Sequence, residues 1–168
     1  MNRAWLDGMW DHMRQKYGIY LRALDAIPAD RFHDHPVSGM RTPAQMVVHT
    51  SGSILRDIAE GIRSGTITAD ETGEAEVATG LATKADVLAF ARTCWDRADA
   101  AIGEVGDEHL SGPVGNPWGI PLNGTFAMVV LNDEFLHHRG QLFAYVRVCG
   151  GEPPFMWGFD DNPEGFGR

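Results

Sequence analysis

Four stretches of the chain repeat apolar residues at the spacing of one helix face. In the first, apolar side chains recur in steps of three and four from Trp5 to Leu24, the period of an amphipathic helix. Thr42 and Thr83 are typical N-cap residues for the second and third stretches, and Pro43 suits a first helical position. The predicted helices cover about residues 3–26, 42–64, 83–103 and 123–149. No alternating stretch is long enough to predict a β-sheet.

Four such helices predict an all-α fold, a four-helix bundle formed by one domain over residues 1–168. The linkers 27–41 and 65–82 exceed the two to eight residues usual between antiparallel neighbours. The second linker is long enough to cross back along a helix, so helices two and three can run parallel. Its acidic residues, Asp70, Glu71, Glu74 and Glu76, are interpreted as part of a solvated loop.

Composition and charge narrow the classes of partner. The chain has 168 residues, 43% of them hydrophobic, and a formal net charge of −9, with no stretch rich in Lys or Arg. Nucleic acid and anionic membranes are therefore not expected as partners, since both attract basic surfaces. The longest apolar run, residues 126–131, is too short to cross a bilayer, and no signal peptide is visible. The two cysteines, Cys94 and Cys149, are interpreted as reduced core thiols, and a cytoplasmic location is expected.

Histidine carries the candidate chemistry. In the fourth predicted helix, Asp133 and His137 stand four residues apart, and so do Glu134 and His138. Residues at this spacing share a helix face, so either pair can bind one divalent metal ion or form a surface hydrogen bond. His49 lies within an otherwise apolar stretch of the second helix. The other four histidines fall at a helix edge or in the linkers, where ordinary structural roles are expected: His12, His33, His35 and His109.

The fourth predicted helix also contains a Glu-x-x-His element and an interior glycine. Glu134 and His137 form a Glu-x-x-His element, but the chain has no second one, so a carboxylate-bridged di-iron site is not expected. Gly140 in the helix interior is interpreted as a point of close helix-to-helix contact.

Two parts of the sequence are specific enough to indicate a family: the run from His137 to Arg147, followed by Gly150-Gly151-Glu152-Pro153-Pro154, and the run from Arg41 to His49. Through them the chain resembles the DinB-like (DinB/YfiT) superfamily. The resemblance implies a four-helix bundle of up-down-down-up topology with a long crossover between helices two and three. It also implies a likeness to proteins that are often homodimeric and that bind a divalent metal, zinc or nickel above all, through three side chains.

Carried over by the resemblance, the metal ligands are His49, Glu134 and His138. Glu134 departs from the usual third histidine of the family, and its carboxylate shifts the preference toward iron or manganese. Gln141 and Tyr145, one and two turns beyond His138, are candidate ligand-contacting residues; no nucleophile or general base can be assigned.

The resemblance implies a metal-dependent enzyme that acts on a small-molecule substrate, with thiol-dependent S-transferase chemistry and a low-molecular-weight thiol as the first expectation. The alternatives are a metal-dependent hydrolase and a non-catalytic, stress-related bundle that binds a metal or a ligand.

Overall fold

The computed structural model describes residues 1–69 and 71–167. In these ranges it is all-helical, as predicted, with two isolated β-bridges and no strand. The α-helices are α1 (Arg3–Asp25), α2 (Pro43–Val47), α3 (Asp57–Ser64), α4 (Glu74–Gly80), α5 (Lys84–Gly103), α6 (Asp107–Ser111) and α7 (Gly124–Val148). The other helical segments are η1 (Ala29–Arg31), η2 (Val48–Arg56), η3 (Glu71–Gly73) and η4 (Phe159–Asp161).

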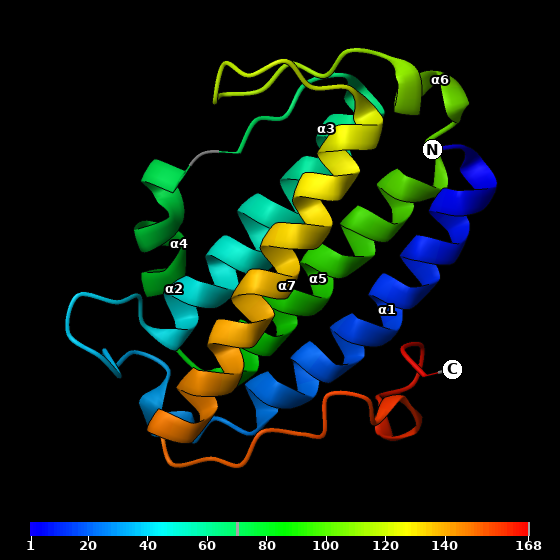
Figure 1. Ribbon diagram of the computed structural model, residues 1–168. Coiled ribbons are helices and arrows are strands. Elements are labelled where there is room, and N and C mark those ends of the chain that lie inside the picture. The colour runs from blue at the N-terminus through cyan, green and yellow to red at the C-terminus, as the bar shows by residue number, and fades with distance from the viewer. Residues whose placement is uncertain (70, 168) are drawn as a thin grey trace.

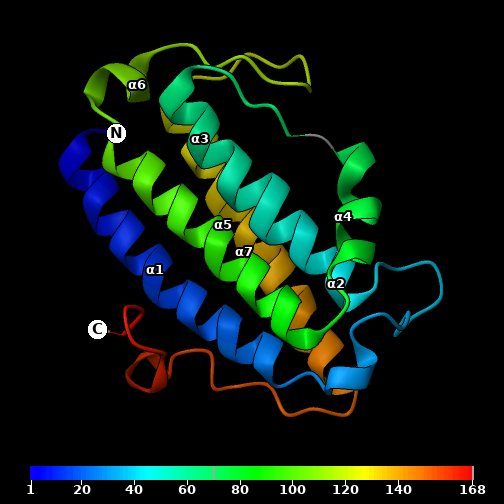
Figure 2. The same cartoon turned by 180° about the vertical axis from the view of Figure 1, so that it is seen from behind.

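Four long helical rods lie side by side (Figure 1). They are α1, the continuous rod α2–η2–α3, α5 and α7. In both ribbon views the rod α2–η2–α3 and α5 run from the lower end of the bundle to the upper end, whereas α1 and α7 run the other way (Figures 1 and 2). The last helix and the second rod are therefore antiparallel, and a residue early in the rod lies level with one late in α7.

Local capping chemistry fixes where the long helices begin. Thr42 and Thr83 each form a capping box: the hydroxyl accepts the backbone N–H of the third helical residue, whose side chain returns a bond to the cap. Asn123 caps α7 through the N–H of Phe126, 2.8 Å away. These caps confirm the predicted starts of the second, third and fourth helices.

The second rod is not a uniform α-helix. Its middle, η2, is a nine-residue π-helix that begins one residue before His49. The wider π turn changes the register of every side chain that follows it, and such turns occur frequently at functional sites. The sequence pattern predicted only an unbroken amphipathic helix here.

The linker between the second and third long helices is partly helical, contrary to the expectation of a solvated loop. It contains η3 and α4, and α4 packs against α2 and η2 (Figure 1). Glu74, the first residue of α4, is 7% exposed, so one member of the acidic run is a buried carboxylate. Glu71 and Glu76 are exposed, and Asp70 lies outside the described residues.

The core is filled by aromatic residues from three of the rods. The ring of Trp95 stacks on Trp10 and Tyr17, with centroids 5.1 and 4.9 Å apart, and Phe135 packs against Tyr17 at 5.8 Å. Trp5, expected on the buried face of the first helix, is 51% exposed. At the start of α1 the neighbouring Leu6, 0% exposed, fills the core position in place of Trp5.

The last helix and the segment after it leave part of their surface uncovered, contrary to the expectation for Gly140. Phe155, Met156 and Trp157 are 70%, 41% and 55% exposed, whereas Phe159 is buried. A Cβ built on Gly140 would meet nothing within 4 Å, so this glycine faces open space and not a neighbouring helix.

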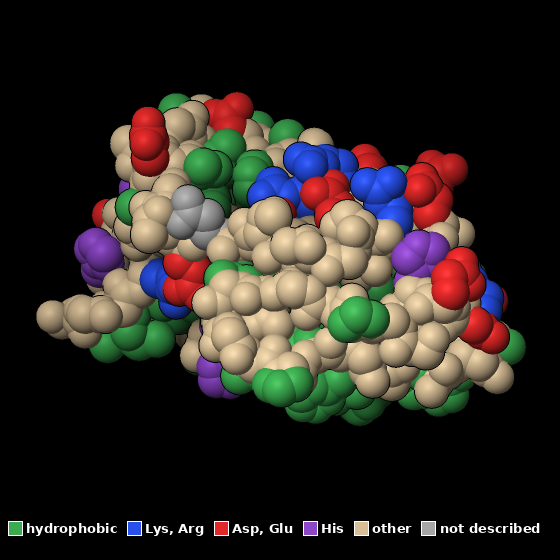
Figure 3. Space-filling view, turned by 90° about the horizontal axis from the view of Figure 1, so that it is seen from above, with side chains coloured by type: hydrophobic (Ala, Val, Ile, Leu, Met, Phe, Trp, Pro, Cys, Tyr) green, Lys and Arg blue, Asp and Glu red, His purple; other side chains and the backbone are tan. Residues whose placement is uncertain are grey.

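The surface mixes both signs of charge. On the face drawn in Figure 3, basic side chains lie beside acidic ones, and Arg63–Glu104 and Arg97–Glu60 are two ion pairs of the protein. Cys94 and Cys149 are buried free thiols, as expected. Within the described part of the chain, no helix has the length and apolar character needed to cross a membrane.

Candidate metal centre

Two predicted ligands from different rods meet inside the bundle. His49 of η2 and His138 of α7 are 5% and 6% exposed. Their Nε2 atoms are 3.1 Å apart, and the rings stand edge to face with centroids 4.6 Å apart. The antiparallel packing of the two rods thus brings together side chains 89 residues apart in sequence.

The outer nitrogen of each ring is held by an oxygen acceptor. His49 Nδ1 lies 2.7 Å from Oε1 of Glu74, which also accepts the Ser53 hydroxyl at 2.6 Å. His138 Nδ1 lies 3.0 Å from Oε1 of Gln141. The amide nitrogen of Gln141 lies 2.8 Å from Nε2 of His137.

The protonation of these groups follows from their surroundings. Burial acts to raise the pKa of Glu74, but hydrogen bonds from His49 and Ser53 and the charges of His49 and Arg41 outweigh it, so the pKa is lowered. Burial lowers the pKa of His138, and His49 and His137 lower it further against the hydrogen bond to Gln141 and the charge of Glu134. At neutral pH the carboxyl is therefore ionised and His138 is a neutral base.

The histidine pair fits a bound cation. A neutral imidazole carries one N–H, and an oxygen acceptor at Nδ1 fixes that hydrogen there on both His49 and His138. The two Nε2 atoms face each other at 3.1 Å, and either a proton shared by the two rings or a metal ion satisfies both lone pairs. Two imidazoles bound tetrahedrally to one zinc ion have nitrogens about 3.3 Å apart, close to the observed separation.

The third predicted ligand contacts only one histidine. Oε2 of Glu134 lies 3.6 Å from Nε2 of His138, and the side chain is 47% exposed. Within residues 1–69 and 71–167, no group of three or more His, Cys, Asp or Glu side chains is arranged to hold a metal ion. His49 and His138 are therefore in contact, whereas Glu134 does not complete a set of three ligands with them.

The remaining candidates lie around the pair. The side chain of Gln141 contacts both His138 and His137. Tyr145 is 2% exposed, and its hydroxyl donates to the Arg41 carbonyl at 2.9 Å, so it anchors the start of the second rod. His137 and Asp133 are exposed. The structure thus turns His138 inward and leaves Glu134 half-exposed beside it, whereas Asp133 and His137 face outward.

Glu74 is the site residue that sequence reasoning missed. It belongs to an acidic run in a linker, and nothing in the local pattern distinguishes it from its solvated neighbours. Its carboxylate is brought to His49 by the packing of α4 on the second rod, and its Oε2 lies 3.6 Å from the guanidinium of Arg41. A carboxylate that holds the outer nitrogen of a histidine is the usual support of a metal-binding imidazole.

A cavity of about 290 Å³ adjoins the histidine pair. His49, Glu71 and Glu134 supply its polar side. Its apolar wall comes from three helical residues and two residues of the loop before α7: Ile54, Ile58, Val130, Trp118 and Ile120. Its size and mixed lining suit a small molecule with an apolar part beside His49.

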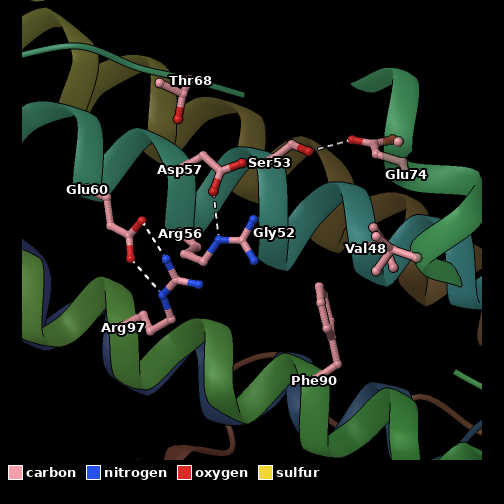
Figure 4. A pocket seen from close by; sticks show the side chains of 12 residues that line it. Val48, Gly52, Ser53, Arg56, Asp57, Glu60, Thr68, Glu74, Phe90 and Arg97 are labelled. Carbon is pink, nitrogen blue, oxygen red and sulfur yellow. Dashed lines mark hydrogen bonds and ion pairs between the residues drawn. The ribbon is translucent and has the colours of Figure 1, made fainter. Parts of the chain in front are cut away.

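A second cavity, of about 410 Å³, lies along η2, α3, α4 and α5 (Figure 4). Its charges neutralise one another: Arg97 makes two bonds to Glu60, at 2.8 and 2.9 Å, and Arg56 pairs with Asp57 at 2.6 Å. Glu74 lines this cavity too, so the carboxylate that holds His49 is reached from it.

The protein is a helical bundle with a buried pair of histidines. The second long rod contributes one histidine and the last rod contributes the other. The chain belongs to the DinB superfamily, whose sequence model matches residues 12–142. Among curated proteins, none matches the sequence.

Two solved structures share the fold. A DinB-like protein from Bacillus subtilis is 22% identical with a TM-score of 0.63, over 82% of this chain and 89% of that one. A mutant of a mycothiol-dependent maleylpyruvate isomerase is 13% identical with a TM-score of 0.60, over 93% of this chain. The chain spans 64% of that isomerase. At these identities the likeness concerns the fold alone.

Proposed function

We propose that the protein binds one divalent metal ion through His49 and His138, with Glu134 as third ligand, and acts with it on a small molecule. The carrying observation is the histidine pair, in which each ring is held at Nδ1 by an oxygen and presents Nε2 to the other ring 3.1 Å away. Two imidazoles favour zinc or nickel, and the carboxylate of Glu134 extends the choice to iron or manganese.

The protein's own groups orient the site. Glu74, ionised at neutral pH, holds the Nδ1 hydrogen of His49 and leaves Nε2 free to bind. Gln141 does the same for His138. The apolar wall of the adjoining cavity, with Trp118 and Ile120, holds the body of a substrate and excludes water. When bound, a divalent ion supplies Lewis acidity, which lowers the pKa of a coordinated thiol or water.

Thiol-dependent transfer is the reaction class we propose. It is supported by membership of the DinB superfamily and by the shared fold with an isomerase described as mycothiol-dependent. The proposal includes a low-molecular-weight thiol as co-substrate, an up-down-down-up helix topology and a cytoplasmic homodimer. A non-catalytic metal- or ligand-binding role is the second candidate, favoured by the exposure of Glu134 and its contact with only one histidine.

Metal uptake is the direct test. The purified protein is stripped with a chelator, dialysed against zinc or nickel, and assayed for bound metal beside His138→Ala and His137→Ala. We expect one ion per chain in the wild type and in His137→Ala, and none in His138→Ala. Equal loss in both variants, or no uptake by the wild type, would refute the site. Thiol-transfer assays of the loaded protein then separate the enzyme from the binding protein.

A further inference from the structure

A third cavity, with a different chemistry, lies on the face of α7 that carries Leu136, Arg139 and Phe143, away from the face that carries His138. It has a volume of about 300 Å³ and is lined by Leu136, Arg139, Gly140 and Phe143 of α7 and by Met156. Met156 belongs to the segment after α7, which in Figure 1 passes below the lower ends of α7 and α1 and ends beside α1. The cavity therefore has one apolar wall and one cationic residue.

The cation in this wall has no partner. Arg139 is 9% exposed, and no described residue accepts a hydrogen bond from its guanidinium or forms an ion pair with it. Among the described residues, the nitrogens of Arg139 do not belong to the fully enclosed polar atoms that have no partner, so the guanidinium keeps an opening toward the cavity that it lines. An anion in the cavity would therefore meet a cation that no carboxylate of the protein's described residues neutralises.

A second buried cation lies between α1 and α7. Lys16 of α1 is 8% exposed, and its ammonium donates to Oδ1 of Asn132, a neutral group 3.1 Å away. Asn132 precedes Arg139 by two turns of α7, about 10 Å along the helix. Burial lowers the pKa of Lys16, and the charge of Arg139 lowers it further. The exposed His12 stands at the edge of the same region, in edge contact with Phe159 at 5.8 Å.

Gly140 keeps the cavity open. A Cβ there would meet no atom within 4 Å, so no neighbouring helix requires a glycine at this position. Glycine nevertheless lowers the stability of a helix relative to alanine. The combination of buried, unpartnered positive charge with an apolar, open wall is found at neither of the other cavities described. Around the histidine pair the added charges are acidic, and along α3 and α5 they are paired.

We propose that this cavity binds a small amphipathic anion, with the carboxylate or phosphate head at Arg139 and the apolar body against Leu136, Phe143 and Met156. Its volume suits a short acyl chain or a single aromatic ring. The inference does not depend on the proposed metal site, because none of these residues is a proposed ligand.

Sodium octanoate is the probe, and its neutral counterpart octanamide is the control. Binding to the full-length protein is measured by calorimetric titration and by the shift of the thermal midpoint. We expect octanoate to bind and stabilise the wild type and octanamide to do neither. Arg139→Gln should weaken octanoate at least about tenfold, the weight of a charge-assisted hydrogen bond. Arg147→Gln, an exposed charge on the same helix, should leave the affinity unchanged.

A second variant separates binding from folding. Gly140→Leu keeps both cations and fills the cavity, so it should abolish octanoate binding while the protein stays folded. Without probe, Arg139→Gln should melt no lower than the wild type, because the charge it removes has no partner. No octanoate binding to the wild type, equal binding of octanamide, or a large loss of stability in Arg139→Gln would overturn the proposal. A wild-type dimer that binds no octanoate and that Gly140→Leu dissociates would also overturn it. That result would mean that a second copy of the chain occupies the cavity.

Discussion

Replacing Glu74 by Gln tests how the histidine pair is oriented. The carboxylate Oε1 takes two short bonds, 2.7 Å from His49 Nδ1 and 2.6 Å from the Ser53 hydroxyl, and Oε2 lies 3.6 Å from Arg41. Glutamine has the same shape but no charge, so both bonds lose their charge-assisted part, about 1 kcal/mol each in the free energy of unfolding. We expect the metal-free variant to be about 2 kcal/mol less stable in a denaturant titration.

The same substitution should weaken metal binding. A carboxylate behind a metal-binding histidine contributes about 10- to 100-fold in affinity, or about 1.4–2.8 kcal/mol. The measurement is a competition titration of zinc between the protein and a chromophoric chelator at fixed pH. Glu76→Gln is the matched control, since Glu76 is exposed on the same short helix. Unchanged zinc affinity in Glu74→Gln, or an equal loss in Glu76→Gln, would refute the assigned role of Glu74.

Three further predictions concern other parts of the bundle. Burial raises the pKa of Cys94 to about 11, so at pH 8 its thiolate is about one part in a thousand and iodoacetamide should label it only in denaturant. Because this pKa lies above the ordinary 9.0, the free energy of unfolding should fall as the pH rises from 9 to 11, where the thiol ionises only in the unfolded chain. A Cys94→Ala variant should not show this fall. Gly18→Ala would overlap the C-terminal segment and should cost about 1–3 kcal/mol, whereas Gly8→Ala, in open space, should gain about 0.5–1 kcal/mol in the same denaturant titration. Tyr145→Phe removes the bond to the Arg41 carbonyl and should cost about 1 kcal/mol in stability without changing zinc affinity, as the chelator competition would show.

The histidine pair shows where local reasoning reaches its limit. His49 stood out in the sequence because a polar side chain in an apolar helix face needs a partner. Its partner on α7 could be named only through a family resemblance, because spacing along one helix does not distinguish Glu134 and His138 from Asp133 and His137. The packing of α7 against the second rod makes that choice, since it turns His138 inward and leaves His137 exposed.

The acidic linker shows a different limit. Four acids in a segment without Lys or Arg have the composition of a solvated loop, and for Glu71 and Glu76 that interpretation agrees with their exposure. Glu74 differs because α4 docks on the second rod and places its carboxylate between His49 and Ser53. Composition averages over a segment, whereas burial is decided residue by residue by what packs against it.

By itself the sequence determined the helices, because caps such as Thr42, Thr83 and Asn123 and a 3.6-residue apolar period act between neighbours in the chain. Only the tertiary structure decided the π-helical register around His49, the carboxylate behind it, and the burial of Arg139 without a partner among the described residues. Each of these depends on contacts between residues far apart in sequence, whose cost or gain exists only once the rods pack and exclude water.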